Sequence, residues 1–139
     1  MEILNKKASF NYYILDEIEA GIVLTGTEVK SVRKGSVDLK DSYIRIKNNE
    51  VFIINMYIAK YEEGNIFNHD ERKERKLLLH KKEIKKLKIE NDIDGNSLIP
   101  LKVYFNKNKV KVLIGICRGK KNYDKRESIK EKDLKRLNK

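Results

Sequence analysis

Residues 19–35 read Glu19-Ala-Gly-Ile-Val-Leu-Thr-Gly-Thr-Glu-Val-Lys-Ser-Val-Arg-Lys-Gly35, and the rest of the chain is organised around them. The Ile-Val-Leu run is apolar and partly β-branched, which suits a buried strand. Thr25 and Glu28 have the spacing of a capping box, so we expect a helix to begin there. Gly35 stands where a left-handed residue follows a helix end. The stretch therefore predicts a strand and a capped surface helix that plugs one end of a β-barrel.

The same stretch carries the first candidate functional residues. Val29 and Val32 are three positions apart and would face the core together. Lys30, Arg33 and Lys34 place positive charge near the helix end, where the helix dipole favours it. Glu19 would then be a carboxylate beside a basic rim. The pattern favours an ordinary capped surface helix, and a binding role for Glu19 beside the basic rim is compatible with it.

Alternation and turn signals outside this stretch predict a small β-rich domain. Phe10, Tyr12 and Ile14 alternate as in a strand, and a hairpin over residues 41–55 would turn at the two asparagines 48 and 49. A short strand follows at residues 57–61, then a charged loop at residues 62–76, in which we expect Arg72 and Lys73 to be solvated.

The later part of the chain continues this pattern. Residues 77–79 would lead into a helix that begins near His80 and ends by Gly95. Residues 98–105 and 110–117 read as a second hairpin. Six or seven short antiparallel strands with two or three helices suit a small closed β-barrel better than a sandwich.

Charge is the strongest compositional signal. The 139 residues include 32 Lys and Arg against 21 Asp and Glu, which gives a net charge of +11. Such an excess favours polyanionic partners, either nucleic acid or an anionic membrane surface, although a lysine-rich soluble surface is the alternative. The excess is concentrated at the end, because residues 118–139 carry ten basic and four acidic side chains. We therefore divide the chain into a barrel, 1–117, and a basic tail, 118–139, without a core of its own.

Catalytic and metal chemistry find little support. Cys117 is the single cysteine and lies in an apolar run, so neither an internal disulfide nor a cysteine-clustered zinc site is expected. His69 and His80 form no ligand pattern, and the chain has no phosphate-gripping glycine loop or nucleophile elbow. We expect no enzyme, cofactor or metal. The start of the chain lacks a secretory pattern and no apolar run is long enough to span a bilayer, so we expect a cytoplasmic protein.

Several blocks of sequence resemble the SsrA-binding protein (SmpB) family, the partners of transfer-messenger RNA (tmRNA, or SsrA RNA). The first is the Glu-Ala-Gly-Ile and Gly-Thr-Glu-Val-Lys-Ser-x-Arg pattern of residues 19–33. The others are Asn5-Lys-Lys-Ala8, Arg75-Lys-Leu-Leu-Leu79, Ile99-Pro-Leu-Lys-Val-Tyr-Phe105 and Gly119-Lys-Lys-Asn-Tyr-Asp-Lys-Arg126. The resemblance covers nearly the whole chain, and it implies an oligonucleotide-binding (OB-like) barrel with surface helices and a free tail.

The resemblance also implies two sets of site residues. The set expected to bind tmRNA is Asn5, Lys7, Glu19, Lys30, Arg33, Leu78, His80 and Lys111. Core packing is the alternative for Leu78 and solvation for Lys111, and the family often has Asn where His80 stands. The set expected to enter the ribosomal decoding centre and messenger channel is Gly119, Lys120, Lys121, Tyr123, Asp124, Lys125 and Arg126. The tail would be disordered when free and helical on the ribosome.

The implied function is the rescue of stalled ribosomes by trans-translation. The protein would bind the tRNA-like domain of tmRNA and deliver it to the ribosome, where small-subunit rRNA is the contact. It would meet elongation factor Tu only indirectly, through alanyl-tmRNA. The main alternative is a general single-strand RNA chaperone with a cold-shock-like barrel. An RNA-modifying enzyme and a membrane-surface protein are weaker alternatives, because neither a catalytic cluster nor a broad apolar stripe is present.

Overall fold

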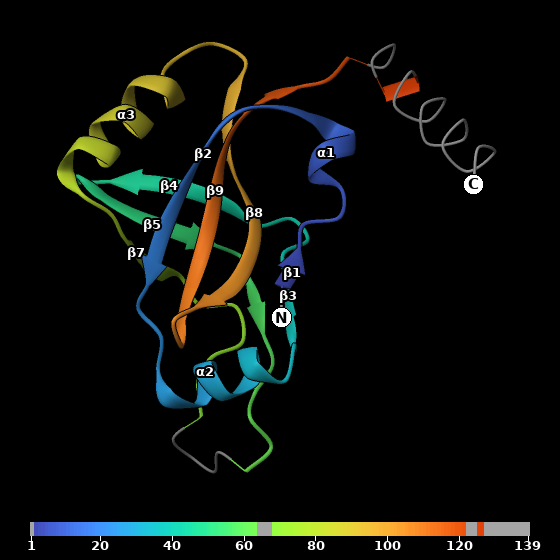
Figure 1. Cartoon of the computed structure of the whole chain (residues 1–139), viewed down its shortest axis with the longest axis vertical. Coiled ribbons are helices and arrows are strands. Elements are labelled where there is room, and N and C mark those ends of the chain that lie inside the picture. The colour runs from blue at the N-terminus through green and yellow to red at the C-terminus, as the bar shows by residue number, and fades with distance from the viewer. Residues whose placement is uncertain (1, 64–67, 122–124, 127–139) are drawn as a thin grey trace.

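A computed structural model describes residues 2–63, 68–121 and 125–126 of the chain, which form mainly antiparallel β-structure with three helices (Figure 1). The strands are β1 (Glu2–Leu4), β2 (Tyr12–Ile22), β3 (Val37–Asp38), β4 (Tyr43–Lys47), β5 (Glu50–Ile54), β6 (Tyr57–Ile58), β7 (Arg75–Leu78), β8 (Asn96–Asn106) and β9 (Lys109–Gly119). The helices are α1 (Ala8–Asn11), α2 (Gly26–Arg33) and α3 (Lys81–Asn91).

Seven strands form one curved sheet in the order β1-β8-β9-β2-β7-β5-β4, and β3 pairs with β6 in a separate ribbon. The sheet curls far enough to bring β4 close to β8. Among the described strands, however, no ladder joins β4 to β8 or β1, so the expected closed barrel is not found. The reason lies in β8, whose edge at residues 102–104 is already occupied by β1. The sheet therefore stays open, with β1 and β4 at its edges.

Strand β2 is longer than the sequence pattern predicted, and it begins later. The alternation of Phe10, Tyr12 and Ile14 suggested a strand there, but Phe10 lies in α1. The strand instead runs through the acidic segment, because Ile18 and Ala20 face the core while Glu17 and Glu19 face outward. Strands β1 and β7 were not predicted either. Strand β7 starts inside the segment expected to be a loop.

The two predicted hairpins and the helix cap are confirmed. Both tight turns place two residues at positive φ, Asn48 and Asn49 in one and Lys107 and Asn108 in the other, as hairpin turns require. Helix α2 begins at a capping box, in which the Thr25 amide donates to the Glu28 carboxylate at 2.9 Å. It ends before Gly35, whose φ is +75°.

Gly115 lies where neighbouring side chains of the sheet leave no room for a Cβ atom. A Cβ atom at this position would lie 2.8 Å from Leu101 Cγ and 2.9 Å from Cys117 Sγ. The neighbouring strands both change register close by, β2 near Asp16 and β8 after Pro100. The bend expected at Gly115 is thus shared with irregularities in its two neighbours. Cys117 belongs to a small apolar cluster beside α1 and is fully buried, as expected.

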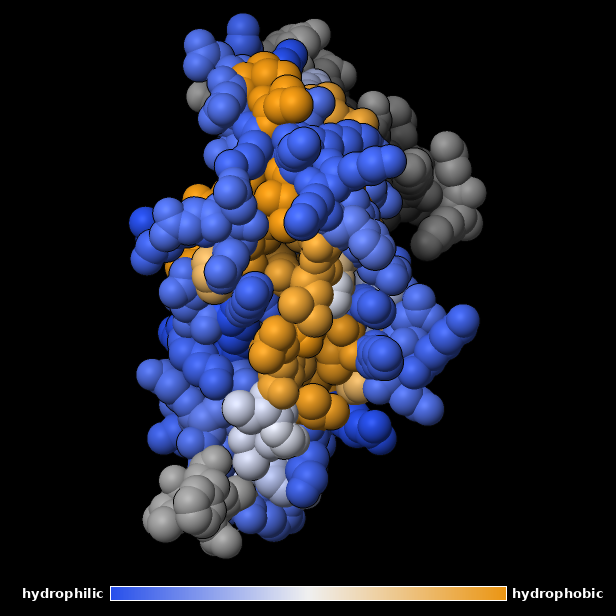
Figure 2. Space-filling model, turned by 90° about the vertical axis from the view of Figure 1, so that its left-hand side faces the viewer, coloured by the Kyte–Doolittle hydropathy of each residue, from blue (hydrophilic) through white to orange (hydrophobic). Residues whose placement is uncertain are grey.

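Apolar side chains left outside the core gather on one side of the molecule. Figure 2 shows apolar surface that runs down this side, from the level of α3 to the level of α2. The elements on this side carry some of the most exposed apolar residues, among them Val23, Leu78 and Ile89. Exposed apolar surface of this kind is typical of interaction sites.

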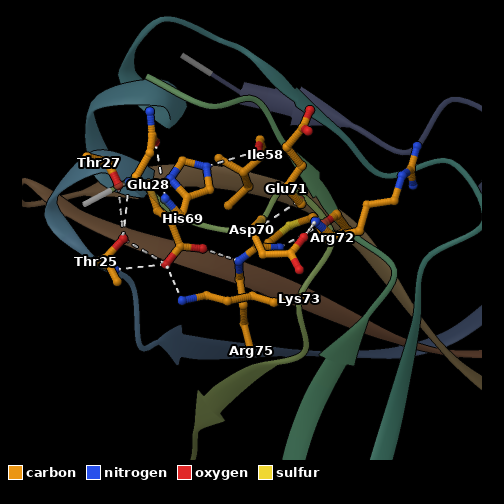
Figure 3. A network of polar contacts seen from close by, with 12 residues as sticks. Thr25, Thr27, Glu28, Ile58, His69, Asp70, Glu71, Arg72, Lys73 and Arg75 are labelled. Atoms are coloured by element: carbon orange, nitrogen blue, oxygen red, sulfur yellow. Dashed lines mark hydrogen bonds and ion pairs between the residues drawn. The ribbon is translucent and has the colours of Figure 1, made fainter. Parts of the chain in front are cut away.

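A buried ion pair fastens α2 to the sheet (Figure 3). Glu28 of α2 and Arg75 of β7 have no exposed side-chain surface, and Arg75 Nε donates to Glu28 Oε2. The Arg75 guanidinium also donates to the carbonyl of Met56 at 2.7 Å and to those of Asp70 and Glu71 at 3.2 Å. One side chain therefore holds the helix, β7 and the segments on both sides of β6. The sequence pattern had assigned Glu28 only to the helix cap and had placed Arg75 in the charged loop.

His69 extends this network to the start of α2. Its Nε2 lies 3.0 Å from the Ile58 carbonyl, which can only accept, so this nitrogen carries the proton. Its Nδ1 lies 2.9 Å from the Thr27 hydroxyl. Within the described residues, every buried side-chain nitrogen and oxygen has a hydrogen-bond partner. The network is therefore complete, and we interpret it as structural rather than as a binding site.

We predict that Glu28→Gln will destabilise the fold by about 3–5 kcal/mol, because it leaves the Arg75 charge buried without a counter-charge. The matched control is Glu50→Gln. Glu50 pairs with Lys76, the next residue of β7, at 3.5 Å on the surface. Its loss should cost less than about 1 kcal/mol. The measurement is urea unfolding at pH 7, and equal effects of the two substitutions would contradict a dominant role for the buried pair.

We also predict that the Glu28→Gln penalty depends on pH. Burial alone would raise the pKa of Glu28, but hydrogen bonds from the Thr25 amide and Arg75, together with the nearby positive charges, lower it below its ordinary value of 4.5. The unfolded chain then binds the proton more readily, so the stabilisation is complete above pH 4.5 and is lost as the pH falls through the lowered value. The unfolding free energies of the unmodified protein and of Glu28→Gln should therefore converge as the pH is lowered from 7 to 3. A constant difference would show that the charge of Glu28 is not what matters.

Candidate nucleic-acid interface

The outer face of the sheet brings together residues from four strands. Leu78 of β7 is paired with Gly21 of β2, Gly21 with Lys111 of β9, and Lys111 with Tyr104 of β8. Directly paired residues point to the same face of a sheet. The four positions therefore form one row across the sheet, with an apolar side chain at one end and a phenol at the other.

Leu78 is exposed rather than packed in the core. Its side chain is 52 % exposed, whereas Leu77 is 2 % exposed and faces inward. The neighbouring Gly21 leaves this side chain room, because a Cβ atom there would lie 3.3 Å from Leu78 Cβ. Core packing was the alternative interpretation of Leu78. The alternation of β7 rules it out, because Leu78 lies on the exposed face.

Glu19 lies two residues before Gly21, on the same outer face. The Tyr104 hydroxyl reaches across β9 and donates to Glu19 Oε2. Two effects raise the pKa of Tyr104 well above its ordinary value of 10.0: burial is the larger, and the hydrogen bond to Glu19 is the second. The phenol therefore keeps its proton. Lys102 lies over the Tyr104 ring, with its ammonium 5.1 Å from the ring centre, and pairs with Glu2 at 3.2 Å.

This arrangement can recognise RNA chemically. The Glu19 carboxylate can accept hydrogen bonds from base amino groups or a 2′-hydroxyl. Lys111 and Lys102 supply positive charge for phosphates, and Leu78 offers an apolar contact for a base or ribose. The face thus combines the three kinds of contact that RNA-binding sheets use.

Asn5 and Lys7 lie apart from this row, beside a groove between the N-terminal segment and residues 35–42. The side-chain amide of Asn5 donates to the Pro100 carbonyl at 2.9 Å, and its backbone N–H donates to the Leu101 carbonyl at 2.8 Å. Asn5 therefore ties the N-terminal segment to the irregular part of β8. Lys7 is exposed at the start of α1, on the rim of the groove.

Lys30 and Arg33 are exposed on α2, at the end of the molecule that this helix covers (Figure 1). The Lys30 ammonium lies 5.3 Å from the centre of the Tyr61 ring, and Lys34 lies 4.8 Å from the same ring. The Arg33 guanidinium lies 5.5 Å from the centre of the Phe105 ring. The two residues expected to bind RNA thus form a basic rim supported by aromatic rings.

His80 is exposed and precedes α3, two residues beyond Leu78. Its amide donates to the Glu83 carboxylate at 2.9 Å. In the part of the chain that the structure describes, no group of His, Cys, Asp and Glu is arranged to hold a metal ion. Burial raises the pKa of the Cys117 thiol to about 11, so it is not a thiolate at neutral pH.

The tail residues are described only in part. Gly119 ends β9 opposite Tyr12, and the Lys120 amide donates to the Asn11 carbonyl at 2.8 Å. Lys120 also lies over the Tyr13 ring at 5.0 Å. The Lys125 amide donates to the Lys121 carbonyl at 3.1 Å, as in a helical turn. Tyr123 and Asp124 lie outside the described residues, as does residue range 127–139, so the expected conformations of the tail are not tested.

Sequence reasoning missed Tyr104 and Lys102 as members of this surface. They belong to the Ile99–Phe105 block, to which no role was assigned. Alternation around the buried Val103 places both on the outward face. That signal was available, but the contact with Glu19 joins residues 85 positions apart, and its strand register was not predictable.

No helix among the described residues has the length and apolar character needed to cross a membrane.

The family model of the SmpB protein matches residues 2–139. SsrA-binding proteins of Staphylococcus aureus strains Newman and N315 are 58 % identical over 132 residues, which cover 95 % of this chain and 86 % of theirs. A solved structure described as "tmRNA-SmpB: a journey to the center of the bacterial ribosome" contains a chain with 45 % identity and a TM-score of 0.74, covering 92 % of this chain and 94 % of that one. The chain belongs to the SmpB family.

Proposed function

We propose that the protein binds the tRNA-like domain of tmRNA and delivers it to stalled ribosomes for trans-translation in the cytoplasm. The observation that carries this proposal is the outer sheet face, where an exposed carboxylate, lysines and an exposed leucine stand together in a chain of the SmpB family. Members of this family are non-enzymatic RNA-binding proteins, so no reaction is assigned. The RNA-binding surface is thus assigned to an open, curved sheet and not to the OB-like closed barrel that the sequence predicted.

The RNA site is centred on Glu19, Leu78 and Lys111. Glu19 accepts hydrogen bonds from RNA donors, Leu78 contacts an unpaired base or ribose, and Lys111 approaches the phosphate backbone. His80 extends the site along the start of α3. Asn5, Lys7, Lys30 and Arg33 lie in the groove or on the basic rim and contribute charge or shape at the periphery.

The second part of the proposal assigns the tail to the ribosome. Gly119 to Lys121 and Tyr123 to Arg126 would enter the decoding centre and the messenger channel, where small-subunit rRNA supplies the negative charge. Residues 1–117 would then be the RNA-binding body and residues 118–139 the ribosome probe. Elongation factor Tu would be met only through alanyl-tmRNA. The high positive charge of the tail supports this assignment, because such a segment is drawn to polyanions.

We predict that Glu19→Ala weakens binding of the tRNA-like domain by about 1–3 kcal/mol, the range for charge-assisted hydrogen bonds, without lowering the melting temperature. Glu17→Ala is the matched control, since Glu17 lies two residues away on the same face and is also exposed. Gel-shift affinity and a thermal melt measure the two effects. Unchanged affinity, or a loss that follows unfolding, would argue against a direct contact.

We predict that deleting residues 124–139 leaves tmRNA affinity largely intact but abolishes tagging of stalled nascent chains. Nothing would then fill the empty decoding site and messenger channel, because the removed segment includes Asp124, Lys125 and Arg126 and the rest of the basic tail. Alanine at Asp124, Lys125 and Arg126 should have nearly the same effect, whereas Lys139→Ala should matter less. The assay compares RNA affinity with tagging in reconstituted translation on a truncated message. Full tagging by the shortened protein would refute the two-part mechanism, and parallel loss of RNA affinity would place the tail in the RNA site.

A further inference from the structure

The hydrogen bond between Tyr104 and Glu19 joins two residues that both lie on the outer sheet face. Tyr104 belongs to β8 and Glu19 to β2, so the phenol crosses the strand between them, β9. Lys111 and Leu113 of β9 face outward beneath this bridge, because each is paired with one of the two bonded residues. The contact therefore lies on top of the sheet, where a ligand of this face would arrive.

The ring of Tyr104 is held by a neighbouring lysine. Its ring lies under the ammonium of Lys102, and Lys102 in turn pairs with Glu2 of β1. A tyrosine has only two side-chain torsions, so a ring clamped in this way presents its hydroxyl at a nearly fixed point. Glu19 has more torsions and an exposed side chain. The hydroxyl therefore restricts the carboxylate rather than the reverse.

The bond leaves half of the carboxylate available. Tyr104 donates to Oε2, and within the described residues Glu19 has no other hydrogen bond or ion pair. The phenol is the donor, because an ionised carboxylate can only accept. Oε1 is thus free to accept from a ligand at the same time as Tyr104 holds Oε2.

We propose that Tyr104 is a positioning residue for RNA recognition: its hydroxyl holds Glu19 in the orientation in which the free carboxylate oxygen accepts a hydrogen bond from RNA. The ligand group is a nitrogen- or oxygen-bound hydrogen, as in a base amino or imino group or a 2′-hydroxyl. This inference rests on the proposed function, since it requires that Glu19 contacts RNA. A carboxylate that is already oriented loses less conformational entropy on binding than a free one.

The test is a double-mutant cycle on the full-length protein, with the tRNA-like domain of tmRNA as the ligand. Tyr104→Phe removes only the hydroxyl, and we expect it to weaken affinity about five- to tenfold while leaving the melting temperature unchanged. Glu19→Ala should weaken affinity by at least fivefold. In the Glu19→Ala protein, adding Tyr104→Phe should change affinity by less than twofold, because the residue through which it acts is gone.

Tyr43→Phe is the matched control. Tyr43 is an exposed tyrosine of β4, outside the row of paired residues, and its substitution should leave RNA affinity unchanged. A merely structural role of the Tyr104 hydroxyl would give equal losses with and without Glu19, which the cycle detects.

Three outcomes would overturn the inference. If Tyr104→Phe binds like the unmodified protein while Glu19→Ala is weak, Glu19 contacts RNA without help and only the positioning role fails. If Tyr104→Phe weakens binding equally in both backgrounds, Tyr104 acts on the RNA itself or on the sheet. If Glu19→Ala retains full affinity, the RNA contact of the proposed function fails, and the positioning role fails with it.

Discussion

The buried ion pair between Glu28 and Arg75 is the constraint on which the rest of the structure depends. Two charges without solvent contact are tolerated only when they neutralise each other and their remaining hydrogen-bonding groups are satisfied. Arg75 meets this condition through three backbone carbonyls besides Glu28. Because Arg75 opens β7, the pair fixes where that strand starts. Strand β7 is short, and this pair acts together with its ladders to β5 and β2 in setting its position.

The start of β7 in turn decides what the outer face contains. With Arg75 buried, alternation sends Leu77 inward and Leu78 outward, and the register with β2 places Leu78 opposite Gly21. A shift of one residue would bury Leu78 and expose Leu77. The long ladders of β2 with β9 and of β8 with β9 then align Lys111 and Tyr104 with this pair. A buried structural network and the proposed RNA-binding face are thus connected through strand register.

The parts of the fold that the sequence predicted well are those specified by neighbouring residues. The capping box at Thr25, the left-handed Gly35 and the asparagine turn at residues 48–49 depend on contacts within a few positions, and each was found where expected. Strand β7, the burial of Arg75 and the role of Tyr104 were missed, because their partners lie 47 and 85 positions away. The closed barrel was predicted wrongly for a similar reason, because the pairing of β1 with β8 cannot be recognised from the sequence of either segment alone. The identities of the candidate residues came from family resemblance, whereas their division among the sheet face, the groove and the α2 rim required the structure.

An acidic residue at the centre of the proposed RNA-binding face, on a protein of net charge +11, calls for a physical explanation. Lysine and arginine contacts to phosphate supply affinity, but they do not distinguish one RNA from another. A carboxylate is repelled by the phosphate backbone, so it contributes favourably only where a hydrogen-bond donor of the RNA reaches it. In its proposed role, Glu19 would penalise RNAs that bring phosphate to this point and favour one that brings a donor, which is how repulsion contributes to specificity. Such discrimination requires a carboxylate that cannot turn away, and the bridge from Tyr104 across β9 meets that requirement.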